Sequence, residues 1–331
     1  MTRLKGDAAV VKRGVATPVA DLVARTAHGE RAALARLLSV IEAGGDPARV
    51  ALEALAGRPP TTAVIGITGA PGAGKSTLTD RLVGSWREQG KRVAVLAIDP
   101  SSPFTGGAIL GDRVRMQRHE TDPDVFVRSM ATRGSLGGLA AAAPQAVRAL
   151  DAAGFDRVLI ETVGVGQVEV AIAGAADTTV VVVTPGWGDA VQAGKAGLLE
   201  IGDLFVVNKA DRDGVTATVH DLQGMLHLAA PRSWAPAVLS TVATDGVGVD
   251  ELVSAIDAHG EHLAETGELA ARRERRVRDE VRGLVLEQLS RDADAVCGGA
   301  TFDTVVARVA TGDLDPYTAA TQLLTPHPVT R

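Results

Sequence analysis

The chain has 331 residues, of which 46% are hydrophobic and 22% charged, so it can bury a full core with room for one large domain and smaller additions. Its formal net charge of -6 argues against a nucleic-acid or anionic-membrane surface, and no apolar run reaches the roughly 18 residues of a membrane span. The single cysteine excludes an intrachain disulfide and a CxxC metal site, so we expect a cytoplasmic protein with no membrane and no nucleic-acid partner.

The first part of the chain predicts short helices. Thr17 followed by Pro18 is typical of a helix start. A stripe of apolar residues at i, i+3, i+4 and i+7 then ends at the glycine pair Gly44 and Gly45. The stripe consists of Leu34, Leu37, Leu38 and Ile41. We expect residues 1–60 to form a helical N-terminal extension without a catalytic role.

The middle of the chain alternates apolar runs with segments long enough for crossover helices. Continuous apolar runs are typical of strands that are buried on both faces. The runs are 63–68, 93–98, 157–162, 179–184, 204–208 and 237–240. The sequence therefore predicts an α/β domain over residues 61–260, with a mostly parallel sheet, helices on both faces and a ligand site beyond the carboxyl ends of the strands.

The strands cease after about residue 260, and helices are predicted again. Close to this boundary, His259 and His262 are interpreted as a solvated helix end. The segment ARRERRVRDEVRGLVLEQL carries an apolar stripe at helical spacing, made of Val277, Val281, Leu284 and Val285. Its many arginines are typical of an RNA-binding helix, but the acidic residues among them favour a solvated face.

A last helix is predicted to begin at Asp315 and Pro316. Its apolar side would carry Tyr317, Ala320 and Leu324 inward. Two helices that project from an α/β domain cannot bury their stripes fully against each other. We therefore expect residues 261–331 to be a helical arm that forms a homodimer.

A phosphate-binding loop is predicted from GITGAPGAGKSTLTDRL. Gly69, Gly74, Lys75 and Ser76 fit the pattern G-x4-G-K-[ST], between a predicted strand and a predicted helix. Backbone N–H groups of such a loop point at phosphates, the lysine reaches the β and γ oxygens, and the serine hydroxyl can ligate Mg²⁺. The residues expected to contact nucleotide here are Gly69, Ala70, Pro71, Gly72, Ala73, Gly74, Lys75, Ser76 and Thr77.

Three carboxylates lie at strand ends or in the loops that follow them. Asp99 ends one strand, Asp112 lies in a glycine-rich loop, and Glu161 ends another strand. Carboxylate oxygens are ligands that Mg²⁺ prefers, directly or through water. With Ser76 they form the predicted magnesium site. The amide of Gly164, in the TVGVGQ that follows Glu161, is a candidate contact for the γ-phosphate.

The stretch VVNKADRDG predicts which base is bound. A buried strand runs directly into Asn208, Lys209 and Asp211. A carboxylate can accept from N1–H and the 2-amino group of guanine together, whereas adenine offers no such pair. The lysine stem can cover the face of the base, and the asparagine can brace the loop. The motif therefore favours GTP and GDP over adenine nucleotides.

These motifs resemble a known family. In order, GITGAPGAGKST, LAIDPSSPFTGGAILGDRVRM, GSLGG, GFDRVLIETVGVGQVE and VVNKAD are similar to the MeaB/ArgK GTPases, which are associated with cobalamin-dependent acyl-CoA mutases, chiefly methylmalonyl-CoA mutase. The resemblance implies a SIMIBI-type P-loop domain and a homodimer that uses its C-terminal arm. It also implies a G-protein chaperone that gates adenosylcobalamin delivery to the mutase and protects that enzyme.

The resemblance also assigns residues. It implies roles in phosphate binding, Mg²⁺ binding and hydrolysis for residues that match the family's motifs, and a base contact for a second loop. That loop is Ser240, Thr241 and Val242, where Thr241 replaces the family's usual alanine and leaves the contact open. The candidate catalytic residues are Lys75, Asp112, Glu161 and Lys195.

Residues 186–197, which we call the switch segment, depart from the family pattern. Many relatives have GAGDELQGIKKG, where this chain has TPGWGDAVQAGKAG. Asp189, Gln192 and Lys195 are retained, but Ala190 and Val191 replace a Glu-Leu pair. The resemblance implies that this segment communicates with the mutase, so the partner or the way in which hydrolysis is stimulated differs.

Other functions fit parts of the pattern. A metal-insertion accessory GTPase shares the domain type but usually carries a cluster of cysteines or histidines, and this chain has one cysteine and seven histidines. A MinD/ParA-type ATPase needs a second lysine early in the phosphate loop, where this chain has Ala70. A transport kinase is not supported, because the H-R-D and D-F-G motifs are missing. A nucleotide-dependent scaffold with incidental hydrolysis stays open.

Overall fold

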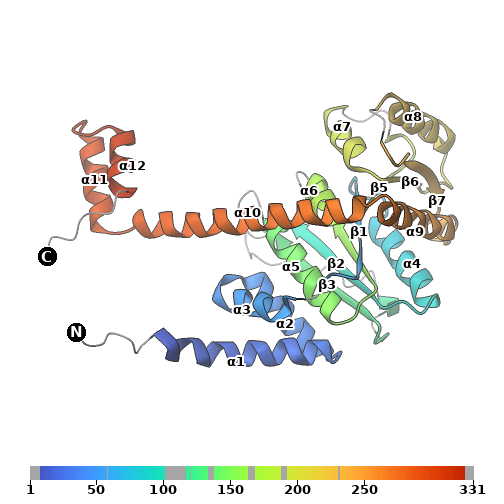
Figure 1. The fold of residues 1–331 in the computed structure, drawn as a ribbon. Coiled ribbons are helices and arrows are strands. Elements are labelled where there is room, and N and C mark those ends of the chain that lie inside the picture. The colour runs from blue at the N-terminus through green and yellow to red at the C-terminus, as the bar shows by residue number, and fades with distance from the viewer. Residues whose placement is uncertain are drawn as a thin grey trace. The chain divides into compact units, whose positions relative to one another are not determined.

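The fold is taken from a computed structural model of the chain (Figure 1). It describes residues 8–57, 59–100, 117–119, 121–132, 138–162, 168–187, 192–229 and 232–324. These form two compact units, Met1–Val277 and Arg278–Arg331. No helix in the described residues is long and apolar enough to cross a membrane.

A seven-stranded sheet with the order β3-β2-β4-β1-β5-β6-β7 forms the centre of the first unit. Every pairing between neighbouring strands is parallel, which confirms the predicted sheet. The strands are β1 (Ala63–Gly69), β2 (Val93–Pro100), β3 (Val125–Thr132), β4 (Arg157–Thr162), β5 (Thr178–Val183), β6 (Leu204–Asn208) and β7 (Ala237–Thr241).

The edge strand β3 is absent from the six strands that the sequence predicts, since Arg128 and Ser129 interrupt its apolar pattern. The guanidinium of Arg128 is paired with Glu42, at 2.7 Å, and donates to the carbonyl oxygen of Ala35 at 3.0 Å. Both partners lie on α2 (Arg31–Ala43). An arginine is accommodated in this strand because a neighbouring helix supplies its acceptors.

Helices cover both faces of the sheet, as predicted. Alternate residues of each strand enter opposite clusters: Val64 packs in one core with α2 and α5, whereas Ile65 packs in another with α4 and α9. A third cluster joins β5 and β6 to α7 and α8. These helices are α4 (Lys75–Glu88), α5 (Gly138–Ala152), α6 (Val168–Ala175), α7 (Gln192–Ile201), α8 (Val215–Leu228) and α9 (Val249–Glu265), with a short 3-10 turn, η2 (Gln117–His119).

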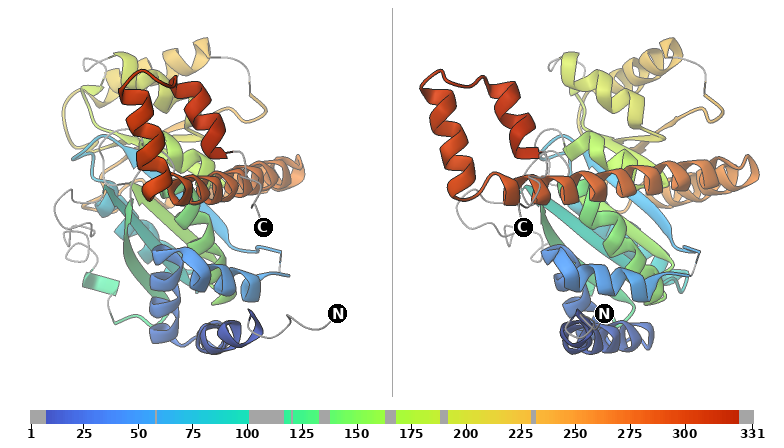
Figure 2. Two further views of the ribbon diagram at one scale, coloured as in Figure 1. Left: turned by 90° about the vertical axis from the view of Figure 1, so that its left-hand side faces the viewer. Right: turned by 60° about the vertical axis from the view of Figure 1, so that its left-hand side comes forward.

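The N-terminal helices share the core of the sheet. The predicted stripe of α2 is buried together with residues of β2 and α5. Figure 2 shows α1 (Ala8–Ala27), α2 and α3 (Gly45–Leu55) grouped at one side of the sheet. The prediction that a helix begins at Pro18 is wrong, because α1 runs through it. A proline inside a helix removes one backbone hydrogen bond, and this helix continues despite that loss.

The C-terminal residues form α10 (Glu268–Val296), α11 (Ala300–Ala310) and α12 (Pro316–Leu324). The long helix and the last helix were predicted, but α11 was not. Within the second unit, α11 and α12 contact each other, with Val305 and Ala319 buried. The expectation that Tyr317 and Leu324 point inward is wrong for the single chain, where both are exposed. Ala320 is exposed too.

His259 is fully buried, so the prediction of a solvated helix end is wrong for this residue. Its Nδ1 lies 2.8 Å from the hydroxyl of Thr178, and its Nε2 lies 3.6 Å from a carboxylate oxygen of Asp203. Burial lowers the pKa of the imidazole, which favours its neutral form. The sequence pattern missed this because the polar groups that contact His259 come from the start of β5 and from the residue before β6.

The first turns of α10 are tied to the sheet by buried carboxylates. Asp177 accepts from the backbone N–H of Val64 at 3.1 Å and pairs with Arg273 and Arg276 at 2.9 and 2.8 Å. Burial raises the pKa of the Asp177 carboxyl, but the two guanidinium groups outweigh burial and hold the pKa below its usual value. Removing these arginines would leave a buried carboxylate without an opposite charge beside it.

Candidate nucleotide site

The phosphate loop leaves the carboxyl end of β1 and enters α4 at Lys75. Gly69 has φ +133°, and a Cβ there would overlap the carbonyl oxygen of Val182 on the neighbouring strand β5. Gly74 has φ +92°, and a Cβ there would overlap the side-chain amide nitrogen of Asn208. Two of the predicted glycines are therefore required by close packing as well as by backbone conformation.

The side chain of Lys75 lies against the phosphate loop that precedes it. Its side chain is buried, and its Nζ donates to the carbonyl oxygens of Gly69 at 2.6 Å and Ala70 at 3.0 Å. The ammonium group is thus held at the phosphate loop. A phosphate oxygen would be a stronger acceptor for this group than a carbonyl oxygen, because it carries a charge.

Ser76 and Glu161 are 85 positions apart in the chain, and the fold brings them into contact. The Ser76 hydroxyl donates to Oε1 of Glu161 at 2.6 Å, and both side chains are buried. Glu161 sits near the end of β4, in register with Ile67 of β1. A hydroxyl and a carboxylate at one sheet edge are ligands that suit Mg²⁺. The residues present therefore fit the predicted metal.

Other predicted phosphate and metal contacts fall outside the described part of the chain. Asp99 lies in β2, next to β4 in the sheet, but its side chain is outside the described residues. Asp112 and Gly164 are outside them altogether. Their assignments stay predictions.

Asn208 connects three loops at the carboxyl edge of the sheet. Its Nδ2 donates to the carbonyl oxygen of Ala73 in the phosphate loop at 2.8 Å. Its Oδ1 accepts from the hydroxyl of Thr241 at 3.0 Å and from the backbone N–H of Ala243 at 3.1 Å. The predicted bracing role of this asparagine is therefore visible as direct bonds to both neighbouring loops.

Thr241, in the second loop predicted to contact the base, has a contact that orients the base motif. The residue is fully buried, and its hydroxyl fixes the orientation of the Asn208 amide. Its neighbours Ser240 and Val242 are exposed and partly buried, respectively. Ala243 was not singled out in the sequence analysis. The one feature of the sequence that points to it is its position directly after Val242.

Lys209 and Asp211 occupy the turn after β6. Lys209 has φ +61°, the one positive φ outside glycine among the described residues. Its Nζ donates to the carbonyl oxygen of Gly72 at 2.7 Å, so its stem extends from the base motif to the phosphate loop. Asp211 is exposed to solvent. The exposed carboxylate of Asp211, close in sequence to Lys209, is available to accept hydrogen bonds from a ligand at the carboxyl edge of the sheet.

The switch segment is partly helical. Helix α7 begins at Gln192 and contains Lys195, whose side chain is outside the described residues. Before the helix, Trp187 is buried in the cluster with α8, and the N–H of Gly186 donates to the hydroxyl of Thr218 at 3.1 Å. The start of the segment is thus held by α8, the helix that follows the base motif.

Gly74→Ala is expected to lower GDP affinity by about 100-fold. A Cβ in the left-handed region costs about 1 kcal/mol, and displacing Asn208 breaks buried hydrogen bonds that each contribute about 1 kcal/mol. Gly90→Ala is the matched control, because Gly90 has φ +75° with nothing within 4 Å of its Cβ position. Calorimetric titration with GDP checks both variants, and equal losses would contradict the contact with Asn208.

The fold and these three joined loops define a P-loop nucleotide-binding protein. The family model "Methylmalonyl Co-A mutase-associated GTPase MeaB" matches residues 34–297. The chain therefore belongs to the MeaB family of P-loop GTPases.

Relatives agree with this assignment. A protein of Pyrococcus abyssi described as a GTPase is 47% identical over 308 residues, covering 92% of this chain and 95% of the relative. GTPase ArgK of Escherichia coli is 37% identical over 261 residues, covering 76% of this chain and 78% of that protein. A crystal structure titled LAO/AO transport system kinase has a TM-score of 0.67 at 27% identity, and the match covers 97% of this chain and 98% of that one.

Proposed function

We propose that the protein hydrolyses GTP and acts as a G-protein chaperone. In this role it gates the delivery of adenosylcobalamin to a cobalamin-dependent acyl-CoA mutase, most simply methylmalonyl-CoA mutase, and protects that enzyme. One observation carries the nucleotide part: Asn208 bonds to the phosphate loop and to the loop after β7 at once. The proposed mutase partner is supported by the description of the family.

The phosphates would be bound by the loop before α4. The backbone N–H groups at the start of this helix and the ammonium group of Lys75 supply positive potential where the β and γ phosphates would lie. Ser76 and Glu161 would hold Mg²⁺, with Asp99 and Asp112 as the further predicted ligands. Bound there, the ion would neutralise charge on the phosphate oxygens.

The base would be selected by the loops after β6 and β7, at the same edge of the sheet. Asp211 would accept from the two donors on the edge of guanine, and the stem of Lys209 would cover the face of the base. The 6-oxo group of guanine is the remaining acceptor on that edge, so it requires a donor. The loop after β7, which follows Thr241, the register partner of Asn208, would supply this donor from its backbone.

The test of the chaperone function is phosphate release from GTP, measured with and without the mutase encoded closest to this gene. The rate should rise with added mutase. A rate that stays flat over the whole titration would contradict the chaperone function while leaving nucleotide binding intact.

We also propose a homodimer formed through α10. Along this helix Val281, Val285 and Leu289 follow one another at four-residue spacing and are 54%, 52% and 57% exposed. Exposed apolar residues repeated on one helix face are typical of a protein interface.

Charges on this face should prevent dimer formation. Val285→Glu combined with Leu289→Glu is expected to give a monomer that binds GDP normally, because the nucleotide loops lie elsewhere in the chain. Light scattering measures the mass. Glu287→Gln is the control, since Glu287 is exposed on the same helix and pairs with Arg291. A dimer that persists in the double variant would place the interface elsewhere.

A further inference from the structure

The loop after β7 is a tight turn whose shape depends on outside support. The N–H of Val242 donates to the carbonyl oxygen of Val247 at 3.0 Å, which closes the turn. Gly248, with φ +76°, completes it, since a Cβ there would overlap the carbonyl oxygen of Ser240. Residues 243–246 lie in between, and the first of them, Ala243, is bonded to Asn208 of the base motif.

One arginine of the phosphate helix donates to this turn. The Nε of Arg81 donates to the carbonyl oxygen of Ala243 at 3.0 Å, and its Nη2 donates to that of Thr244. Arg81 belongs to α4, six residues after Lys75. The guanidinium therefore connects the helix that starts at the phosphates with the loop that borders the base.

Ala243 is held on both sides. Its N–H donates to Asn208 and its carbonyl accepts from Arg81, and the residue itself is 3% exposed. A charged donor strengthens a hydrogen bond relative to a neutral one. The orientation of the backbone in this turn is thus set jointly by the base motif and by α4.

We propose that Arg81 is a positioning residue for guanine recognition, acting through the backbone of residues 241–244. This inference rests on the proposed guanine nucleotide function. The N–H groups of Val242 and Ala243 already donate to Val247 and Asn208. Arg81 therefore holds the turn so that the N–H of Thr244 meets the 6-oxo group of the base. Without Arg81 the turn relaxes, and the part of the affinity that depends on the 6-oxo group falls, while contacts to the phosphates and to the 2-amino group persist.

Two nucleotides separate this role from general stabilisation. GDP carries the 6-oxo group and the N1–H, and the diphosphate of 2-aminopurine riboside lacks both but keeps the 2-amino group and the phosphates. For Arg81→Gln in the full chain we expect GDP to bind about tenfold more weakly and the 2-aminopurine nucleotide to change by less than about twofold. Arg81→Lys, which keeps one charged donor, should restore part of the GDP affinity.

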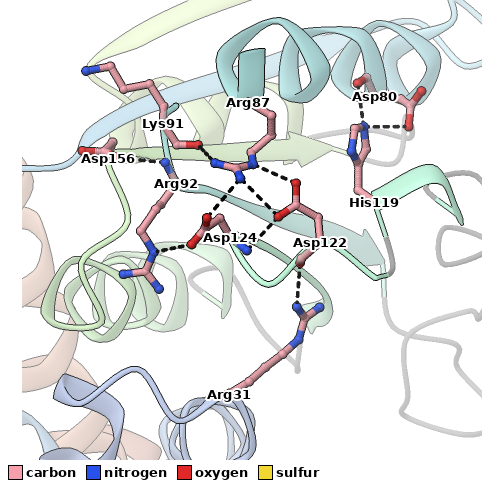
Figure 3. A network of polar contacts seen from close by, with 9 residues as sticks. All are labelled: Arg31, Asp80, Arg87, Lys91, Arg92, His119, Asp122, Asp124 and Asp156. Carbon is pink, nitrogen blue, oxygen red and sulfur yellow. Dashed lines mark hydrogen bonds and ion pairs between the residues drawn. The ribbon is translucent and has the colours of Figure 1, made fainter. Parts of the chain in front are cut away.

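Arg87→Gln is the matched control on the same helix. Arg87 donates to the carbonyl oxygen of Lys91 and pairs with Asp122 and Asp124, at 2.6, 2.8 and 3.0 Å (Figure 3). These partners precede β2 and β3, so they lie at the edge of the sheet opposite the nucleotide loops. This variant should lose stability without altering the ratio of the two affinities.

The outcomes are distinct. A selective loss of GDP binding in Arg81→Gln, partly restored in Arg81→Lys, supports the inference. Equal losses for both nucleotides, or no loss, overturn it even where the wild type prefers GDP to ADP. A wild type that binds ADP as tightly as GDP would overturn the proposed guanine nucleotide function, and with it the inference.

Discussion

Asp211→Asn should change the nucleotide that the protein prefers from GDP to xanthosine diphosphate. Xanthine has a carbonyl group where guanine has its 2-amino group, so the amide nitrogen of an asparagine can donate where the carboxylate accepted. A site that leaves polar groups unpaired with the wrong base discriminates by about 10⁴-fold or more. We expect GDP affinity to fall at least about 100-fold and xanthosine diphosphate to bind more tightly than GDP.

The position of Asp211 makes this substitution a clean test. The side chain is exposed, in the turn between β6 and α8, so an isosteric amide disturbs no buried contact. Asp213→Asn is the control, because Asp213 is exposed in the same turn and has no proposed part in binding the base. Competition binding with the two diphosphates measures the change. An unaltered preference in Asp211→Asn would remove this residue from the base site.

Phosphate release should be slow for the protein alone and about 10³-fold faster with its mutase. Isolated P-loop GTPases without a complete clamp of positive charge hydrolyse GTP at roughly 10⁻⁴ to 10⁻² s⁻¹, and a partner that supplies charge or orders the switches restores the rate. The phosphate loop sequence, residues 69–77, contains no arginine. Three arginines in neighbouring segments, Arg113, Arg115 and Arg133, lie outside the described residues.

We propose that the switch segment carries the effect of the partner. The N–H of Gly186 donates to the hydroxyl of Thr218 on α8, and α8 follows the base motif in the chain. Helix α8 therefore contacts the start of the switch segment and is joined to the base motif. A segment that pairs differently with partner and nucleotide can have two arrangements, which GTP and GDP favour unequally.

Lys195→Ala should therefore abolish the stimulation and leave GDP affinity close to that of the wild type. Lys91→Ala, at the turn between α4 and β2, is the control for loss of a lysine charge. The measurement is the slope of the rate against mutase concentration. An unchanged slope for Lys195→Ala would exclude the relay through this residue, while a rising rate for the wild type would still support the chaperone function.

Local patterns determined much of the fold. Six strands and the two nucleotide motifs could be predicted because a buried parallel strand is apolar along its whole length, and because phosphate binding requires glycines, lysine and serine at fixed spacing. The edge strand β3 was missed for the same reason: Arg128 breaks the pattern, and its acceptors come from α2.

The contacts between motifs were decided by tertiary structure alone. Asn208 and Ala73 are 135 residues apart, and Arg81 and Ala243 are 162 apart, yet both pairs are bonded. His259 is buried for a related reason, because Thr178 in β5 and Asp203 just before β6, which contact it, are far from it in the chain. The sequence by itself determined which groups are proposed to bind a guanine nucleotide. The parallel register determined which of them meet, because it brings the carboxyl ends of strands far apart in the chain to one edge.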